Sequence, residues 1–382
     1  MAGVADRPLR ALVVGAGSGG RLSIGAVVDD AGYELAGIAD RSAQASAAAA
    51  ADLAPGTPTF ADVGQALDDL RPDVVCVSTW APSHREITER ALAAGVRGLV
   101  VEKPLAGTVT DARAVLDTLV GQRVPVVVPH GLMSMPAPLH LLDEVRSGAL
   151  GRLRAVQIDC TGWDLINAGI HWLQFAVACL GDDPVTTVEC VTDVSTRTYR
   201  DGFMVETAAV TSARTAAGVR LEVRTGDDID VASPTGTRIA LVGDRGSVVY
   251  QPWEHEYRID TGAGETVVTR PPSELPTGHR LYLRRLREQI AAGTTDYTIP
   301  RQSLHALEII RAAYLAAREG AAVTLPLHRD DLAAPTGSDD DSWLPGEVHD
   351  PRRGGRDGRS LPPPRHPAPT AVSPITTPGG SP

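Results

Sequence analysis

The chain has 382 residues, of which 43% are hydrophobic, and a formal net charge of -11. This length exceeds one ordinary domain and predicts two domains with an appendage. An acidic protein without basic, aromatic-rich stretches gains no electrostatic attraction to nucleic acid or to anionic membrane surfaces, so we expect neither as a partner.

The N-terminal part, residues 1–131, alternates short apolar runs with helical spacing. It begins without the basic and apolar segments of a signal peptide, and no run reaches roughly 18 apolar residues, so we expect a cytoplasmic protein without a membrane span. Strands are expected at 9–15, 34–40, 57–60, 72–79, 96–104 and 124–131, with helices between them. Ser83 and Glu86 have capping-box spacing at the start of one helix. The alternation predicts a doubly wound parallel sheet.

The second part, residues 132–327, has a different rhythm. Helices are expected at about 136–148 and 166–180, on either side of a strand at 153–162. The following strands are expected at 184–194, 206–214, 217–226, 236–242, 246–250, 256–260 and 264–269. Glycines of the hairpin type, at 217–218 and 262–264, indicate that this α+β domain has a mostly antiparallel sheet. Two closing helices, at 279–292 and 302–319, are expected to pack back towards the first domain.

The last part, residues 328–382, is rich in proline, glycine and charged residues and has almost no large apolar side chains. Such a segment cannot bury enough surface to offset the entropy of folding, so we expect a disordered tail. We favour an inert extension, and docking of a partner by its proline-rich stretch is the alternative.

A glycine-rich loop follows the first strand and has the pattern Gly-x-Gly-x-x-Gly. It comprises Gly15, Ala16, Gly17, Ser18, Gly19 and Gly20. Alone the pattern is weak in a protein with 38 glycines, but here it opens a helix, as in dinucleotide-binding domains. Gly15 permits the tight turn, Gly17 lets the backbone approach a pyrophosphate, and Gly20 allows close packing of helix and strand. The alternative is a glycine turn that binds nothing.

Asp40 ends the second strand, twenty residues beyond Gly20, and is expected to accept hydrogen bonds from the adenosine ribose. Its charge would repel a 2′-phosphate, which favours NAD over NADP. Arg41 could neutralise such a phosphate or stack on adenine, so NADP stays open as the alternative.

Lys103 is the only lysine in the sequence, and every other strongly basic residue is arginine. The composition is typical of a GC-rich genome, in which lysine is replaced by arginine. A lysine kept under that pressure indicates a role in proton chemistry, because a guanidinium stays charged. Chance retention is the alternative. The four cysteines are scattered without a Cys-x-x-Cys pair, so no metal site is predicted.

Three segments are expected outside the carboxyl ends of the strands, where doubly wound sheets bind ligands. They are Thr79–His84, Glu102–Pro104 and Asn167–His171, and the candidate cofactor contacts among them are Thr79, His84, Glu102 and Lys103. Asn167 and His171 are four residues apart on an expected helix and would share a face. For hydride transfer at an alcohol, a histidine can take the hydroxyl proton and a lysine can stabilise the alkoxide.

Several of these side chains could have a purely structural role instead. His171 could be a satisfied core histidine, and His84 could cap or pack its helix. Glu102 could orient Lys103 instead of touching the cofactor. Asp164 lies one helical interval before Asn167 and is a weaker candidate.

Taken in order, the segments GAGSGG…AD, APSHREI, VVEKPLA, SGALGRLRAVQ, INAGIHWL and LHALEIIRAAYLAAREGAAVTLPL resemble the glucose–fructose oxidoreductase/inositol dehydrogenase/rhizopine catabolism (Gfo/Idh/MocA) family over about residues 8–327. The resemblance implies a Rossmann domain and a second domain with an open sheet, which buries itself in a homodimer or homotetramer. The family's lysine falls on Lys103 and its catalytic histidine on His171, and the Lys103–Pro104 bond is expected to be cis.

This sequence differs from the family pattern at two points. Asn167 stands where the family usually has aspartate, and the segment after residue 130 lacks a usual arginine. Asparagine can orient a neighbour but cannot hold charge. We expect an NAD(P)-dependent oxidoreductase acting on a secondary alcohol or ketone of a sugar, sugar derivative or cyclitol. The alternatives are a retained-NAD enzyme that cleaves glycosides by transient oxidation, a non-catalytic nucleotide-binding regulator, or, least favoured, a scaffold that recruits a partner through its tail.

Overall fold

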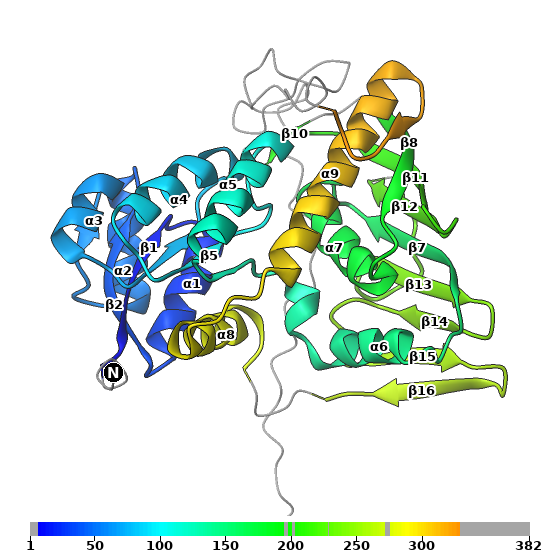
Figure 1. Cartoon of the computed structure of the whole chain (residues 1–382), viewed down its shortest axis with the longest axis horizontal. Coiled ribbons are helices and arrows are strands. Elements are labelled where there is room, and N and C mark those ends of the chain that lie inside the picture. The colour runs from blue at the N-terminus through cyan, green and yellow to red at the C-terminus, as the bar shows by residue number, and fades with distance from the viewer. Residues whose placement is uncertain (1–6, 195–197, 201–202, 228, 272–275, 329–382) are drawn as a thin grey trace, which may run out of the picture.

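The computed structural model describes residues 7–194, 198–200, 203–227, 229–271 and 276–328. They form two lobes, each built on one sheet. Helix α9 runs between the two sheets, and α8 lies beside α1 on the first lobe (Figure 1). The tail expected from residue 328 lies, apart from His328, outside these described residues.

The first lobe contains a six-stranded parallel sheet in the order β3-β2-β1-β4-β5-β6. Its strands are β1 (Leu9–Val14), β2 (Tyr33–Ala39), β3 (Thr59–Phe60), β4 (Val74–Val77), β5 (Gly98–Val101) and β6 (Val126–Val127). Its helices are α1 (Ser18–Val28), α2 (Ala43–Leu53), α3 (Val63–Leu70), α4 (His84–Ala93) and α5 (Val109–Gln122), with a short 3-10 helix, η1 (Ala81–Ser83), before α4. Strands β4 and β5 are buried throughout, as expected where helices cover both faces. The predicted doubly wound sheet is confirmed.

The start of α4 differs from the prediction. Ser83 makes no side-chain capping bond to the helix. Its hydroxyl bonds instead to the Thr79 hydroxyl at 2.7 Å and donates to the Trp80 carbonyl at 2.9 Å. The predicted capping box is therefore wrong, because η1 turns Ser83 back towards the end of β4.

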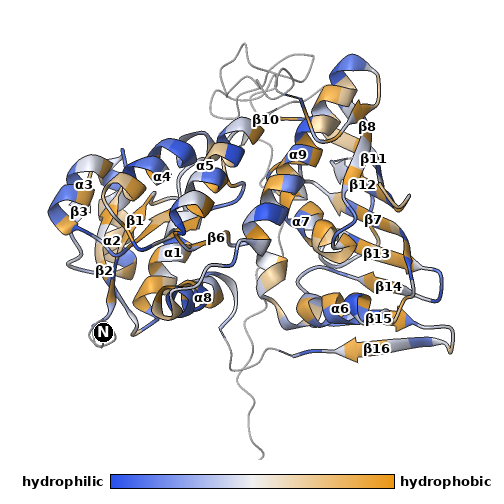
Figure 2. Ribbon diagram, in the orientation of Figure 1, coloured by the Kyte–Doolittle hydropathy of each residue, from blue (hydrophilic) through white to orange (hydrophobic). Residues whose placement is uncertain are grey.

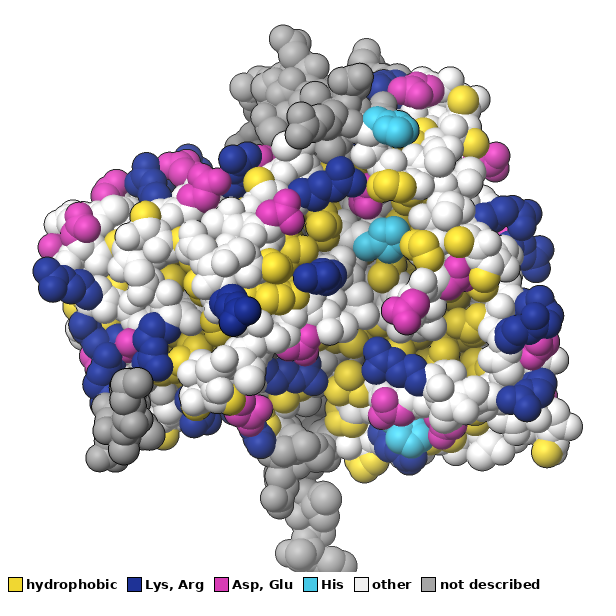
Figure 3. Space-filling model, in the orientation of Figure 1, with side chains coloured by type: hydrophobic (Ala, Val, Ile, Leu, Met, Phe, Trp, Pro, Cys, Tyr) yellow, Lys and Arg dark blue, Asp and Glu magenta, His cyan; other side chains and the backbone are white. Residues whose placement is uncertain are grey.

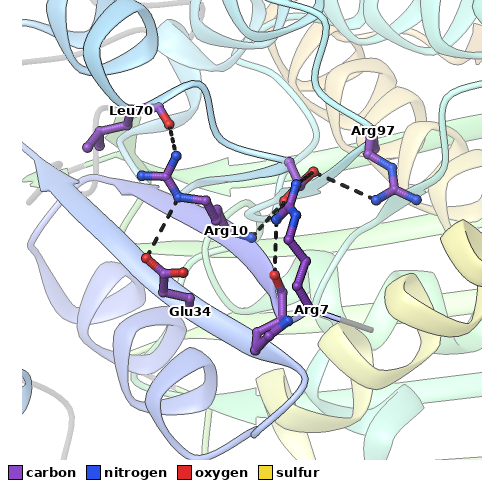
Figure 4. A network of polar contacts seen from close by, with 7 residues as sticks. Arg7, Arg10, Glu34, Leu70 and Arg97 are labelled. Carbon is purple, nitrogen blue, oxygen red and sulfur yellow. Dashed lines mark hydrogen bonds and ion pairs between the residues drawn. The ribbon is translucent and has the colours of Figure 1, made fainter. Parts of the chain in front are cut away.

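Charged side chains tie the amino ends of the strands together, on the edge opposite the ligand-binding edge (Figure 4). Asp73, just before β4, accepts hydrogen bonds from Arg7 at 2.7 and 3.1 Å and from the backbone N–H of Arg10 at 2.9 Å. Arg97, just before β5, lies 3.7 Å from the same carboxylate. These contacts hold the pKa of Asp73 below its ordinary value, even though burial acts to raise it. The cluster fixes the neighbouring strands at an edge that carries no candidate site residue.

The second lobe contains a nine-stranded sheet in the order β16-β15-β14-β13-β7-β12-β11-β8-β17. Its strands are β7 (Leu153–Thr161), β8 (Val185–Asp193), β11 (Ala208–Thr215), β12 (Arg220–Gly226), β13 (Thr237–Gly243), β14 (Ser247–Tyr250), β15 (Glu256–Asp260), β16 (Glu265–Thr269) and β17 (Val323–Thr324). Only β7 and β12 pair in parallel among these described strands, which confirms a mostly antiparallel sheet. A separate hairpin of β9 (Thr198–Arg200) and β10 (Phe203–Val205) was not predicted.

Three helices, α6 (Pro136–Arg146), α7 (Gly169–Leu180) and α9 (Thr298–Glu319), lie on one face of this sheet (Figure 1). Helix α7 is hydrophobic along much of its length (Figure 2) and almost entirely buried. Helix α8 (Gly278–Ala292) packs on α1 and β5, and α9 also reaches α5, where Arg113 pairs with Glu308. Both closing helices thus contact the first lobe.

Acidic and basic side chains are interspersed over the described part of the face seen in Figure 3, with no broad basic area. Within the described ranges, no helix combines the length and apolar character needed to cross a bilayer.

Candidate active site

A cleft of about 1670 Å³ runs along the carboxyl ends of the first lobe's strands and continues between the two lobes. Its lining comes from the glycine loop, from the segments after β2, β4 and β5, and from the second lobe. This volume exceeds that of an ordinary small-molecule pocket and suits a dinucleotide together with a second ligand.

The glycine loop has the shape that a pyrophosphate needs. Gly15 has a φ of +103°, and a Cβ atom there would lie 2.4 Å from the carbonyl oxygen of Ser78. A Cβ on Gly20 would lie 1.9 Å from the carbonyl oxygen of Gly15, whereas nothing lies within 4 Å of that position on Gly17. No side chain caps the N-terminus of α1, so its N–H groups are available to an anion. Gly15, Ala16, Gly17 and Ser18 all line the cleft, and these residues fit a dinucleotide.

Asp40 lines the same cleft and also holds the loop. Its carboxylate accepts hydrogen bonds from the backbone N–H groups of Ala16 and Ser42, both at 2.8 Å. Arg41 is exposed beside it and lines the cleft. The carboxylate therefore has a structural task besides the predicted contact with ribose.

Thr79 and His84 have different environments. Thr79 lines the cleft, whereas His84 is fully buried and is not part of the lining. The ring nitrogens of His84 lie 3.0 Å from the carbonyl of Pro104 and 2.9 Å from that of Thr79. Burial lowers the pKa of His84. His84 therefore fastens the Thr79 and Pro104 segments to each other, and the structure does not bring it to the cleft.

Glu102 lies under the glycine loop, where a Cβ on Gly19 would meet its side chain at 3.3 Å. Its Oε1 lies 2.5 Å from Nε2 of His279, at the start of α8. Burial would raise the pKa of Glu102, but the hydrogen bond and charge of His279, together with Lys103, keep it below its ordinary value. Sequence analysis missed His279, because only the fold brings α8 beside β5.

Lys103 reaches from the first lobe to the second. Its Nζ donates a hydrogen bond to the backbone carbonyl of Asn167 at 2.9 Å, and both residues line the cleft. The Lys103–Pro104 peptide bond is cis, as expected. Asn167 lies in a turn before α7, which begins at Gly169, so its predicted place on the helix of His171 is wrong.

Asp164 shapes that turn. Its carboxylate accepts hydrogen bonds from the backbone N–H of Asn167 at 2.7 Å and from its Nδ2 at 3.2 Å. Such a bond satisfies a turn N–H in competition with helix formation, which explains why the helix starts later than predicted. A buried negative charge thus lies directly beside the asparagine that replaces the family's aspartate.

His171 lines the cleft at the first turn of α7. Its Nδ1 accepts a hydrogen bond from the backbone N–H of Gly131 at 3.4 Å, and its ring meets that of His130 edge to face at 5.4 Å. Burial, and then the charge of Lys103, lower the pKa of His171 well below 6.5. Burial likewise lowers the pKa of His130 to about 3. Both rings are therefore neutral at physiological pH.

A second buried carboxylate, Glu206, supports the same turn. It accepts hydrogen bonds from the backbone N–H of Leu165 at 2.7 Å and from the hydroxyl of Tyr314 at 2.6 Å. Burial and the nearby charge of Asp164 raise the pKa of Glu206 to about 7. Sequence analysis had no signal for Glu206, which stood at the edge of an expected strand.

Comparison with known proteins agrees with the fold of the first lobe. Residues 9–130 match the model of the Gfo/Idh/MocA oxidoreductase family, NAD-binding Rossmann fold. Residues 9–130 therefore belong to the NAD-binding Rossmann domains of the Gfo/Idh/MocA oxidoreductases. Among the described residues, no group of three histidine, cysteine, aspartate or glutamate side chains could hold a metal ion.

Two curated relatives match parts of this protein. It is 35% identical over 92 residues to a D-apiose dehydrogenase of Paraburkholderia graminis, covering 24% of each protein. It is 27% identical over 152 residues to the rhizopine catabolism protein MocA of Rhizobium meliloti, covering 40% of this protein and 46% of that one. The matches thus span less than half the length of these relatives.

The likeness in fold extends further. A crystal structure of an aldose-aldose oxidoreductase from Caulobacter crescentus superposes with a TM-score of 0.70 at 23% identity. The superposition covers 84% of this protein and all of that one. Both lobes therefore share the architecture of that protein.

Proposed function

We propose that this protein is an NAD-dependent oxidoreductase that transfers hydride to or from a secondary alcohol or ketone of a sugar, sugar derivative or cyclitol. The observation that carries the proposal is the meeting of Lys103, Asn167 and His171 in the cleft that begins at the glycine loop. Gly15, Ala16, Gly17, Ser18 and Gly20 would hold the pyrophosphate, and Asp40 the adenosine ribose. When bound, the nicotinamide supplies or accepts the hydride.

In this proposal Lys103 is the residue that exchanges a proton with the substrate oxygen. Its ammonium group, hydrogen-bonded to the carbonyl of Asn167, gives a proton to the substrate oxygen during reduction, and its neutral amine takes that proton during oxidation. Lysine also offers positive charge to the alkoxide. Arginine could not replace it, because a guanidinium does not deprotonate.

His171 is assigned an orienting role in this scheme. With Nδ1 accepting from Gly131, the neutral ring carries its proton on Nε2 and can donate a hydrogen bond to the substrate oxygen. Because its pKa is far below 6.5, the ring is a weak proton acceptor. This division of labour differs from the expectation that His171 takes the proton.

We favour NAD over NADP for an electrostatic reason. The carboxylate of Asp40, held in place by two backbone N–H groups, would repel a 2′-phosphate. Because Arg41 lies beside it and could offset this repulsion, the experiment compares the two cofactors directly.

The test is turnover of reduced nicotinamide, followed by absorbance with a panel of sugars and inositols and with NAD or NADP. Lys103→Ala is expected to lower kcat by a factor of about 10² to 10⁴ while NAD affinity changes little. Lys103→Arg is expected to be nearly as poor, although it keeps the charge. Arg318→Ala, which removes an exposed cation at the end of α9, serves as the matched control.

Turnover that survives in Lys103→Ala would contradict the mechanism. Tight NAD binding without net turnover on any polyol would contradict the dehydrogenase proposal. It would support the retained-NAD or regulatory hypotheses instead.

We also propose that the protein forms a homodimer or homotetramer through its nine-stranded sheet. Among the described residues, the face opposite α6, α7 and α9 is not covered by a helix and exposes Val191, Val210, Val242 and Val267, at 37% to 75% of their surfaces. Val191 and Val210 are neighbours across β8 and β11. Replacing both by aspartate is expected to yield monomers by light scattering, whereas a wild-type monomer would contradict the proposal.

A further inference from the structure

Trp253 lies at the end of the cleft that belongs to the second lobe, in the loop between β14 and β15. Its φ is +76°, in the left-handed region. This region is unfavourable for a bulky side chain and usually marks strain that the surrounding structure maintains. The strain does not serve burial, because 38% of the residue is exposed.

Several contacts hold the indole in place from behind. Its backbone N–H donates to the buried hydroxyl of Tyr250 at 3.2 Å. Its ring meets that of buried Trp172 edge to face, with centroids 5.9 Å apart. Trp172 directly follows His171 in α7, so this support joins the indole to the helix of the candidate site.

The indole of Trp253 also packs against Gly131. Its missing Cβ would lie 2.5 Å from the far edge of the Trp253 ring, so the indole rests directly on the glycine backbone. The N–H of the same glycine bonds to His171. The ring is therefore one residue away from the group assigned to the substrate oxygen, with Lys103 and Asn167 in the same cleft.

We propose that Trp253 is a platform for the C–H face of a six-membered polyol ring, a pyranose or a cyclitol, whose edge hydroxyls meet Lys103, Asn167 and His171. This inference rests on the proposed function and narrows its substrate class. The face of an indole carries partial negative charge and attracts the partially positive axial C–H groups that equatorial hydroxyls leave on each face of such a ring. An acyclic polyol presents no such fixed face.

The experiment measures binding, so that it does not depend on turnover. The full-length protein, saturated with NADH, is titrated calorimetrically with myo-inositol, with D-glucose and with D-sorbitol, which is acyclic. We expect myo-inositol or D-glucose to bind more tightly than D-sorbitol. Trp253→Gly removes the ring and also relieves the strained φ, because glycine tolerates that region, so the variant is expected to fold.

Trp253→Gly is expected to weaken binding of the ring polyol about tenfold or more, and Trp253→Phe, which keeps an aromatic face, by less than about threefold. The NADH dissociation constant should stay within about twofold in both variants. Unchanged polyol affinity in Trp253→Gly would overturn the inference. So would equal losses in the glycine and phenylalanine variants, a parallel loss of NADH binding, or a wild type that binds neither ring polyol.

The two proposals fail separately. Ring-polyol binding that depends on Trp253 but leads to no change in nicotinamide absorbance would contradict the oxidoreductase and leave the platform standing. Turnover with an unchanged KM in Trp253→Gly would contradict the platform and leave the oxidoreductase proposal standing.

Discussion

Glu206 is predicted to make the stability of the folded protein depend on pH. Burial, and then the charge of Asp164, raise its pKa from the ordinary 4.5 to about 7. Because the folded state disfavours the carboxylate, the stability associated with this group is fully present below pH 4.5 and is lost as the pH rises through about 7. At about 1.4 kcal/mol for each pH unit, the difference of about 2.5 between the two pKa values corresponds to about 3 kcal/mol.

Glu206→Gln is the perturbation that isolates this effect. The amide stays neutral, and its oxygen can still accept from the N–H of Leu165, the bond that Glu206 makes at 2.7 Å. Relative to wild type, the variant should therefore gain about 2 to 3 kcal/mol in the free energy of unfolding between pH 5 and pH 8. Urea titrations at several pH values, followed by circular dichroism, measure the difference.

Glu265→Gln is the matched control, because Glu265 is 57% exposed on β16 and its pairing with Arg258 contributes little. Its stability difference from wild type should not change with pH. The reasoning is refuted if Glu206→Gln and wild type lose stability in parallel as the pH rises.

Three further predictions concern the cleft. Gly20→Ala would bring a Cβ to 1.9 Å from the carbonyl oxygen of Gly15, so NAD affinity measured by calorimetry should fall at least about 100-fold; retained affinity would contradict the assigned role of the loop. Asn167→Asp, which restores the family's residue, would place two buried carboxylates side by side where a 3.2 Å hydrogen bond now lies. The repulsion between them should lower both the melting temperature and kcat. The double variant Asp164→Asn/Asn167→Asp should recover part of both losses. Because the pKa of His171 lies well below 6.5, a profile of kcat/KM against pH should show no limb from this ring at pH 6.5. A limb there that disappears in His171→Asn would show that the ring titrates at its ordinary pKa.

The first lobe could be predicted from the sequence because its signals are local. Buried parallel strands are continuous apolar runs, and the helices between them have their own spacing, so β1 to β6 follow from the sequence read in order. The glycine loop is local as well, since a positive φ at Gly15 and close contacts at Gly20 each require a residue without a side chain. The meeting of Lys103 and His171 in one cleft followed from the rule that ligands bind at the carboxyl ends of strands, together with the family resemblance.

The tertiary structure decided which side chains reach the cleft and in what state. His84 belongs to a segment that ends beside the cleft, but its ring is buried and its two nitrogens contact the backbone carbonyls of Pro104 and Thr79. Asn167 lies outside the helix because its N–H donates a hydrogen bond to the carboxylate of Asp164. The roles inferred for Glu206 and Trp253 depend on contacts with residues distant in sequence. Tyr314 donates a hydrogen bond to Glu206, and Gly131 packs against the ring of Trp253. Periodicity encodes which face of an element is apolar, whereas burial, charge and hydrogen bonding of a single side chain depend on contacts between distant segments, and these set its pKa and its role.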